Sequence, residues 1–244
     1  MEQDLTTGSV FKRIVYFSLP YLLSYFLQTL YGMADLFITG QFYGVDTITA
    51  VSNGSQIMHM MTVIIVGLAM GTTVTIGHSV GAKCMEQAEK IIGNTITLFM
   101  GIAVAFTVIL VVLVKPIVVL IATPQEAVAG TSIYLLICFI GIPFITAYNI
   151  ISSIFRGLGD SKSPMYFIGI ACVMNIALDY LFMGAFHMGA AGAALGTVCA
   201  QTFSVLVALW VIRRRKTGIS LKKSDFKIET AVIGQVGGQA GLRK

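Results

Sequence analysis

Residues 91–114 read IIGNTITLFMGIAVAFTVILVVLV, a run of 24 residues without a single ionisable side chain. An α-helix rises about 1.5 Å per residue, so this run forms a helix about 36 Å long. The hydrocarbon core of a bilayer is about 30 Å thick. The run therefore predicts a helix that crosses a membrane.

Five further runs without a charged side chain are long enough to cross, if His59 is counted as neutral: 14–34, 47–77, 127–155, 163–178 with 180–186, and 188–212. Turn-forming sequences separate the six runs, at 40–44, 77–81, 115–116 with 123–124, 157–164 and 186–189. The sequence predicts an all-α membrane protein with six transmembrane helices in residues 1–216. Residues 217–244 are polar and basic at first, and we expect a cytoplasmic linker and tail there.

The composition supports this fold class and excludes others. Of 244 residues, 56% are hydrophobic and 11% are charged, against about 25% charged in soluble domains. Secreted, cytosolic and disordered proteins are excluded. The cysteines at 84, 138, 172 and 199 lack metal-ligand spacing, so we expect reduced packing residues and no bound cofactor. No GxxxxGK[ST] motif occurs, so a carrier would have to use an ion gradient.

The basic residues are distributed unequally between the two sides of the predicted bundle. With the N-terminus inside, thirteen Lys and Arg fall on the inner segments and only Lys115 falls on the outer ones. Cytoplasmic loops carry such an excess. We therefore expect a multi-pass protein of the inner or plasma membrane, with both termini cytoplasmic. The net charge of +5 reflects this bias and indicates no nucleic-acid partner.

Two acids lie within the predicted spans, and ionisable groups in hydrocarbon are functional candidates by default. Asp35 lies about 31 Å into the first helix and Asp179 about 24 Å into the fifth, so both fall in the outer half. Asn175 precedes Asp179 by one helical turn, and Thr197 lies about two turns into the last helix. This set of oxygen ligands suits H⁺ or Na⁺ and no transition metal. An interhelical polar clasp is the alternative.

Weaker signals surround this set. Tyr31 precedes Asp35 by four residues and Gln28 precedes it by seven, so the three share one helix face. His59 and the pair Tyr148-Asn149 could line a cavity, but single polar residues on apolar helices are more often packing contacts. Gly157-Leu-Gly-Asp160 matches the short GxGD signature of intramembrane aspartyl proteases. Because Asp160 falls in a cytoplasmic loop and Asp35 near the opposite face, we predict no enzyme.

In combination, several motifs resemble the multidrug and toxic compound extrusion (MATE) family, in its DinF-like branch, over about residues 9–216. They are the first helix with Pro20, Gln28, Tyr31 and Asp35, the stretch Gly77-His-Ser-Val-Gly-Ala82, the stretch Arg156-Gly-Leu-Gly-Asp160, and Asn175-xxx-Asp179.

The resemblance implies two six-helix lobes that form a V around a cavity and export cationic or amphipathic drugs in exchange for H⁺ or Na⁺. It also implies that Asp35, Asn175, Asp179 and Thr197 form the ion-coupling site of the N-terminal lobe. Pro20 matches the helix-bending point, and Gln28, Tyr31 and Asn149 are the candidate cavity residues.

The length departs from this family pattern, because such transporters have twelve helices and this sequence supplies the N-terminal lobe only. Either the chain is a truncated product or two copies pair, and the atypical tail after Lys227 favours truncation. We expect secondary active multidrug or cation efflux, with a lipid-linked precursor flippase of related fold or a non-transporting, partner-binding half as alternatives. The expected partners are small-molecule substrates, the bilayer, and the missing C-terminal lobe or a second copy.

Overall fold

A computed structural model describes residues 10–214 and Asp225, and the predicted linker and tail lie outside this part except for Asp225. The described chain is almost entirely helical and contains no strand, so the predicted all-α class is confirmed. Its elements are α1 (Val10–Phe42), α2 (Val45–Gly81), α3 (Met85–Leu120), α4 (Gln125–Ile140), α5 (Ile142–Gly157), α6 (Lys162–Asp179), the π-helix η1 (Tyr180–Ala185) and α7 (Gly189–Arg214).

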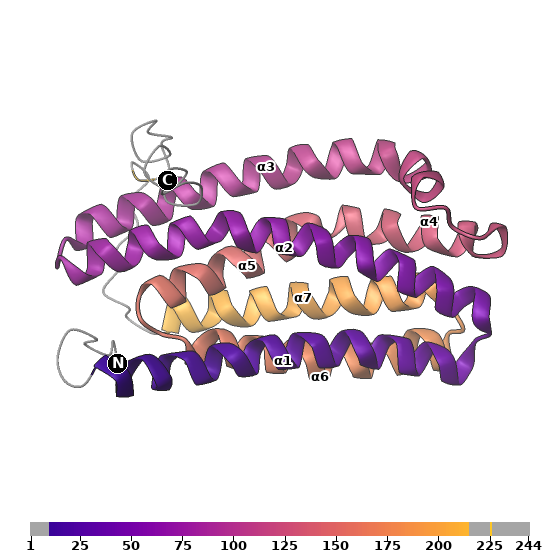
Figure 1. Ribbon diagram of the computed structural model, residues 1–244, viewed down its shortest axis with the longest axis horizontal. Coiled ribbons are helices and arrows are strands. Elements are labelled where there is room, and N and C mark those ends of the chain that lie inside the picture. The colour runs from indigo at the N-terminus through magenta and orange to yellow at the C-terminus, as the bar shows by residue number, and fades with distance from the viewer. Residues whose placement is uncertain (1–9, 215–224, 226–244) are drawn as a thin grey trace.

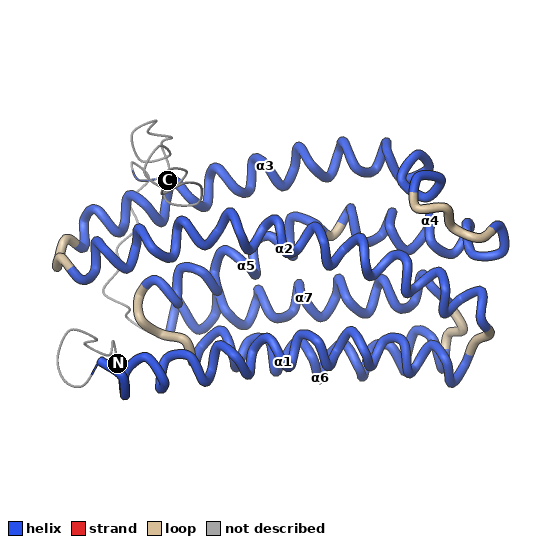
Figure 2. Tube along the Cα trace, viewed as in Figure 1, coloured by secondary structure: helices blue, strands red, loops and turns tan. Residues whose placement is uncertain are grey.

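The helices lie side by side along one axis and run back and forth between the two ends of the bundle (Figure 1). α1 packs against α6, α2 packs against α4 and α5, and α7 lies between α6 and α4 (Figures 1 and 2). The connections at 82–84 and 158–161, predicted to be cytoplasmic, both lie at the end where α1 begins and α7 finishes. The connections at 43–44, 121–124 and 186–188 lie at the opposite end, so the alternation matches the predicted topology.

Four elements are long and apolar enough to cross a membrane: α2, α3, α6 with η1, and α7. The pair α4 and α5 makes a fifth if it is taken as one bent span. The prediction of six spans also counted α1, which is 33 residues long but is not among these. Its apolar run is diluted by four tyrosines and by serine, threonine and glutamine. α1 thus has the length of a span but no stretch as apolar as those of the other four elements.

The predicted single span over 127–155 is broken in the structure. α4 and α5 meet at Gly141 with a bend of 52°. Pro143 causes the break, because it has no N–H to donate to the carbonyl of Phe139 one turn earlier. A backbone N–H at the end of α4 donates to that carbonyl, and so does the hydroxyl of Thr107 on α3, at 3.1 Å. The end of α4 is therefore closed by its own backbone and by a neighbouring helix.

Two predicted breaks lie inside helices. The stretch 77–81 forms the last turns of α2, and Pro116 lies within α3, which continues to Leu120. Charges and glycines mark where a chain leaves the hydrocarbon, but an α-helix can continue beyond that level because its backbone bonds are internal. The helices are consequently longer than the charge-free runs from which they were predicted.

Candidate functional site

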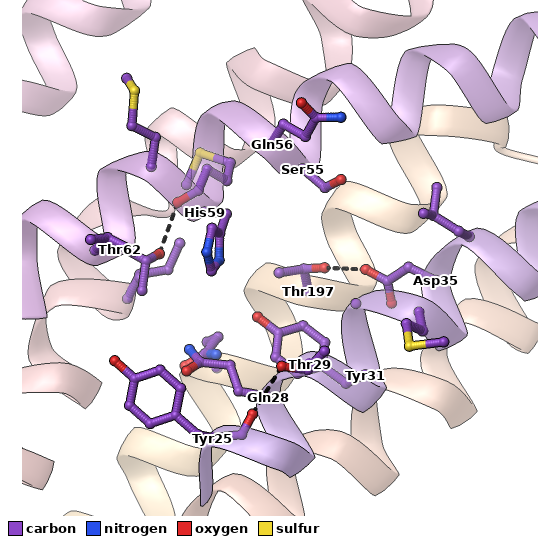
Figure 3. Close-up of a pocket in the computed structure, with 18 of the residues that line it drawn as sticks. Tyr25, Gln28, Thr29, Tyr31, Asp35, Ser55, Gln56, His59, Thr62 and Thr197 are labelled. Carbon is purple, nitrogen blue, oxygen red and sulfur yellow. Dashed lines mark hydrogen bonds between the residues drawn. The ribbon is translucent and has the colours of Figure 1, made fainter. Parts of the chain in front are cut away.

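A cavity of about 680 Å³ opens in the bundle near Asp35. Its walls come from α1, α2, α4, α5 and α7, and Figure 3 shows it from one side. The polar lining residues are Tyr25, Gln28, Thr29, Tyr31, Asp35, Ser55, Gln56, His59, Thr62, Tyr134, Asn149, Thr197 and Gln201.

The four residues predicted to bind the coupling ion lie together beside this cavity. The hydroxyl of Thr197 on α7 donates to Oδ2 of Asp35 on α1, at 3.3 Å (Figure 3). The Asp35 carboxyl group also interacts with the side chains of Asn175 and Asp179 on α6. Asp35, Asn175 and Asp179 are each at most 2% exposed. Three helices thus bring two carboxyl groups, an amide and a hydroxyl to one buried point.

Most polar atoms of this group have no hydrogen-bond partner within the described chain. They are Oδ1 of Asp35, both carboxyl oxygens of Asp179, and Oδ1 and Nδ2 of Asn175. Two adjacent carboxylates in a medium of low dielectric constant repel each other, and unpaired buried polar atoms cost free energy. A proton shared between the carboxyl groups, or a small hard cation bound by the oxygens, would relieve both costs. The arrangement therefore fits H⁺ or Na⁺.

The part of the chain that the structure describes holds no cluster of side chains of the kind that binds transition metals. No group of three or more His, Cys, Asp or Glu side chains occurs there. The four cysteines are free thiols, and Cys138 and Cys172 are buried packing residues as predicted, whereas Cys84 and Cys199 are exposed, so the packing prediction is wrong for these two.

Gly196 on α7 lies against the Asp179 carboxyl group. A Cβ atom at this position would lie 2.1 Å from Oδ1 of Asp179 and 3.6 Å from Nδ2 of Asn175. Only the absence of a side chain lets the α7 backbone approach the acid this closely. Sequence reasoning missed Gly196, although a glycine directly before Thr197 on the facing helix was the available signal.

The end of α1 beyond Asp35 is tied to the segments on both sides of the η1–α7 connection. The Tyr43 hydroxyl donates to the carbonyl of Met183 in η1 at 3.0 Å and accepts from the N–H of Gly189 at 2.9 Å. The hydroxyl of Thr39, which is fully buried, also lies 3.5 Å from the sulfur of Met183. The π-helix itself begins directly after Asp179, and such segments are frequent at functional sites.

The predicted cavity residues Gln28, Tyr31 and Asn149 all line the cavity. Gln201 also lines it and interacts with the Tyr31 hydroxyl. Sequence reasoning missed Gln201, yet it follows Thr197 by four residues and so shares its helix face.

His59 lines the cavity with an exposed side chain, so the interpretation of this residue as a packing contact is wrong. Ser55 and Thr62 flank it at helical spacing on the same wall of α2 (Figure 3).

Asp160, the acid of the GxGD match, forms hydrogen bonds with the first residues of α6. Its Oδ1 accepts hydrogen bonds from the N–H groups of Lys162 and Ser163, each at 3.0 Å, and its Oδ2 accepts from the Ser163 hydroxyl at 2.6 Å. Gly159 has a φ of 84°, in the left-handed region that favours glycine, and this turns the chain toward the start of α6. Asp160 therefore satisfies the first N–H groups of α6 in the way of a helix cap.

Pro20, the predicted bending point, lies inside α1, which continues through it as one helix. The next residue, Tyr21, has the Arg156 guanidinium over its ring at 5.4 Å from the centroid. Tyr16, four residues before Pro20, has the Lys162 ammonium over its ring at 4.6 Å. Two cations that flank the α5–α6 connection thus contact α1 on both sides of the proline.

Known proteins with similar sequences are named as multidrug proteins. The chain is 33% identical over 241 residues to the probable multidrug resistance protein YpnP of Bacillus subtilis, covering 98% of this chain and 54% of that protein. It is 27% identical to the multidrug export protein MepA of Staphylococcus aureus, covering 93% of this chain and 50% of that protein. The chain spans about half the length of the curated relatives it matches.

Solved structures agree in fold. A MOP superfamily transporter from Pyrococcus furiosus superposes with a TM-score of 0.85 at 25% identity, over 94% of this chain and 51% of that one. Structures of MATE described as in the bent and the straight conformation match with the same TM-score of 0.85. The fold of this half is therefore similar to both.

The MatE family matches residues 20–181, more than half of the chain, and the match includes α1 from Pro20 onward and continues past Asp179. With a membrane-type helical bundle and the fold of solved MATE transporters, the chain belongs to the MatE family.

Proposed function

We propose that the protein is a secondary active transporter that exports cationic or amphipathic small molecules in exchange for H⁺ or Na⁺. One observation carries the proposal: Asp35 belongs both to the lining of the cavity and to the buried group with Asn175, Asp179 and Thr197. Cargo and coupling ion would therefore act on the same carboxyl group. The names of the relatives, multidrug resistance and export proteins, support the same role.

The coupling follows from charge. When the acid pair is ionised, the cavity is negative and attracts a cation. When a proton or Na⁺ occupies the pair, that attraction is lost and the cargo leaves. Ion binding can also bias α1 between two shapes if the ion binds one of them better, and Pro20, which removes a backbone hydrogen bond, is the proposed bending point.

The rest of the transporter belongs to the proposal too. The chain spans about half of its relatives, so the other wall of the cavity would come from a C-terminal lobe or from a second copy of this chain. We also propose that the end where α1 begins faces the cytoplasm, with the N-terminus, in a plasma or inner membrane; the excess of basic residues at that end supports this orientation. Impermeant thiol labelling of an Asp46→Cys variant from outside tests this orientation.

The test is ethidium efflux by cells that express the complete transporter or a demonstrated dimer. We expect the double variant Asp35→Asn, Asp179→Asn to lose gradient-driven efflux while it remains inserted and folded. Asparagine keeps the size and hydrogen-bonding capacity of each acid, so an interhelical clasp would tolerate it. Asp46→Asn is the matched control, since Asp46 is an exposed acid in the first turn of α2.

Normal efflux by the double variant would reduce the acid pair to a clasp. Absent efflux by the wild type, with membrane insertion demonstrated, would favour a flippase or a non-transporting half. Replacing the Na⁺ gradient with a proton gradient in proteoliposomes separates the two coupling ions.

A further inference from the structure

His59 lines the cavity, but the proposed ion coupling at Asp35 and Asp179 assigns it no role. It lies on α2, across the cavity from α1, and Figure 3 shows its imidazole pointing from the α2 wall into the space between α2 and Thr197. The side chain is exposed to the cavity. Ionisable residues inside a membrane bundle that face a cavity are typically functional.

The charges around His59 are few. Among the lining residues, the other titratable groups are Asp35, Tyr25 and Tyr31 on α1 and Tyr134 on α4. The lining residues from α5 and α7, namely Ile145, Asn149, Thr197 and Gln201, are neutral, and none of the lining residues is a lysine or arginine. A protonated His59 would therefore be the one positively charged side chain among the lining residues, and it would face the negative charge of Asp35 across the cavity.

Histidine ordinarily changes its charge between about pH 5 and pH 8, whereas tyrosine does not. A cationic cargo inside the cavity would be attracted by the acid pair and repelled by a protonated imidazole. A proton on either group makes the net charge of the cavity more positive, and the two groups act from opposite walls.

We propose that His59 is a second proton-binding group of the cavity, and that its protonation lowers the affinity of the cavity for cations. This inference rests on the proposed function and deepens it, because cargo release would then depend on two protonation sites on two helices. His59 would set how strongly cation affinity depends on pH, and the acid pair would remain the primary site.

The experiment measures the binding of tetraphenylphosphonium to the purified complete transporter, or to a demonstrated dimer of this chain, in nanodiscs, at about pH 8 and about pH 5.5, on the two sides of the ordinary histidine range. The variants are His59→Gln and His59→Asn, which are neutral at both pH values. His78→Gln is the matched control, because His78 lies on the same helix, is exposed, and does not line the cavity. Size-exclusion chromatography and thermal unfolding verify that each variant is folded.

We expect acidification to weaken binding more in the wild type than in the His59 variants. The extra factor should be about twofold to thirtyfold, the range that Coulomb's law gives for unit charges about 8 Å apart at effective dielectric constants of about 80 to 20. His78→Gln should behave as the wild type.

The outcomes separate the two proposals. If binding by the His59 variants depends on pH as it does in the wild type, this inference is wrong, whether or not the variants bind less tightly overall. His59 would then be a contact residue only, and the proposed function would stand. If the folded wild type binds no cation at about pH 8, the proposed function fails, and the role of His59 fails with it.

Discussion

The two parts of α1 are held in different ways. In residues 10–34, none of the described side chains is buried, and large apolar residues such as Phe11 (76%) and Leu19 (66%) are exposed. In residues 35–42, Asp35, Ile38 and Thr39 are each at most 2% exposed. The first part is fastened by partly buried residues and by cations over the rings of Tyr16 and Tyr21. The second is held by core packing, by the contact of the Thr39 hydroxyl with the Met183 sulfur and, beyond the helix, by the hydrogen bonds of Tyr43.

This difference indicates where α1 can move. Apolar side chains in a membrane lose little when a protein contact is exchanged for a lipid contact, so the first part is weakly held. The buried second part contains the ion-binding carboxylate and is fixed to η1 and α7. Pro20 lies in the weakly held part, between the two cation contacts. Three predictions follow the contrast, from the tightly held end to the loosely held one.

The largest effect is expected from Gly196→Ala, which disturbs the tightly held end. The added methyl group must displace the Asp179 carboxyl group, because its position is 2.1 Å from Oδ1. Overpacking of this kind costs about 1–3 kcal/mol, and we expect ethidium efflux to fall to the level of empty cells. Thermal unfolding and efflux are the measurements.

Gly101→Ala on α3 is the matched control, since a Cβ atom there meets nothing within 4 Å. It should leave both stability and efflux near the wild-type values. A Gly196→Ala variant with wild-type efflux would mean that the Asp179 position is not critical.

A smaller loss is expected from Tyr43→Phe. The variant removes both hydrogen bonds of the hydroxyl and leaves the Met183 carbonyl and the Gly189 N–H without this partner. Because the site is partly buried, the free energy of unfolding should fall by about 1–2 kcal/mol. Tyr180→Phe, which loses one exposed bond to Gln41, should change it by less than about 0.5 kcal/mol. Equal losses of unfolding free energy in the two variants would contradict the idea that Tyr43 holds the end of α1 more tightly than the Tyr180–Gln41 hydrogen bond does.

The smallest effect on stability is expected from Tyr21→Leu, in the loosely held part. The variant loses the ring under Arg156, a half-exposed contact worth about 0.5–1 kcal/mol. Hydrogen exchange should rise in residues 10–25 of α1, with the melting temperature nearly unchanged, and Tyr21→Phe should keep the wild-type exchange. A large drop in melting temperature would show that the first part of α1 contributes more to the fold than its exposure indicates.

The sequence located the residues of the site because membrane helices have a fixed rise and a nearly fixed length to cross. Counting from the ends of the charge-free runs placed Asp35 and Asp179 at similar depth, and the structure brings them together. The role of Gly196 could not be counted in this way, because it depends on how closely α7 approaches α6. The bend at Pro143 is visible in the sequence only as a proline, and the added hydrogen bond from Thr107 of another helix to the Phe139 carbonyl is not visible there at all.

His59 shows a further limit. A single histidine in an apolar helix has the same sequence signature whether it is packed or faces a cavity. The direction it faces is set by the crossing of α2 with α4 and α5. Gly54 fixes part of that crossing, since a Cβ atom there would lie 2.2 Å from the ring of Tyr134 on α4. Pair contacts of this kind are not encoded in the periodicity of either helix alone.

The lengths of α2 and α3 have a consequence for the surrounding lipid. They contain 37 and 36 residues, or about 55 Å of helix each, against about 30 Å of hydrocarbon. Even at a tilt of 40°, the upper end of the usual range, such a helix extends about 42 Å along the bilayer normal. The α2–α3 hairpin must therefore reach the headgroups, where the Glu86–Lys90 ion pair lies near its tip. Hydrophobic mismatch in a thinner or thicker bilayer can then be absorbed by a change of tilt, without drawing that pair into the acyl chains.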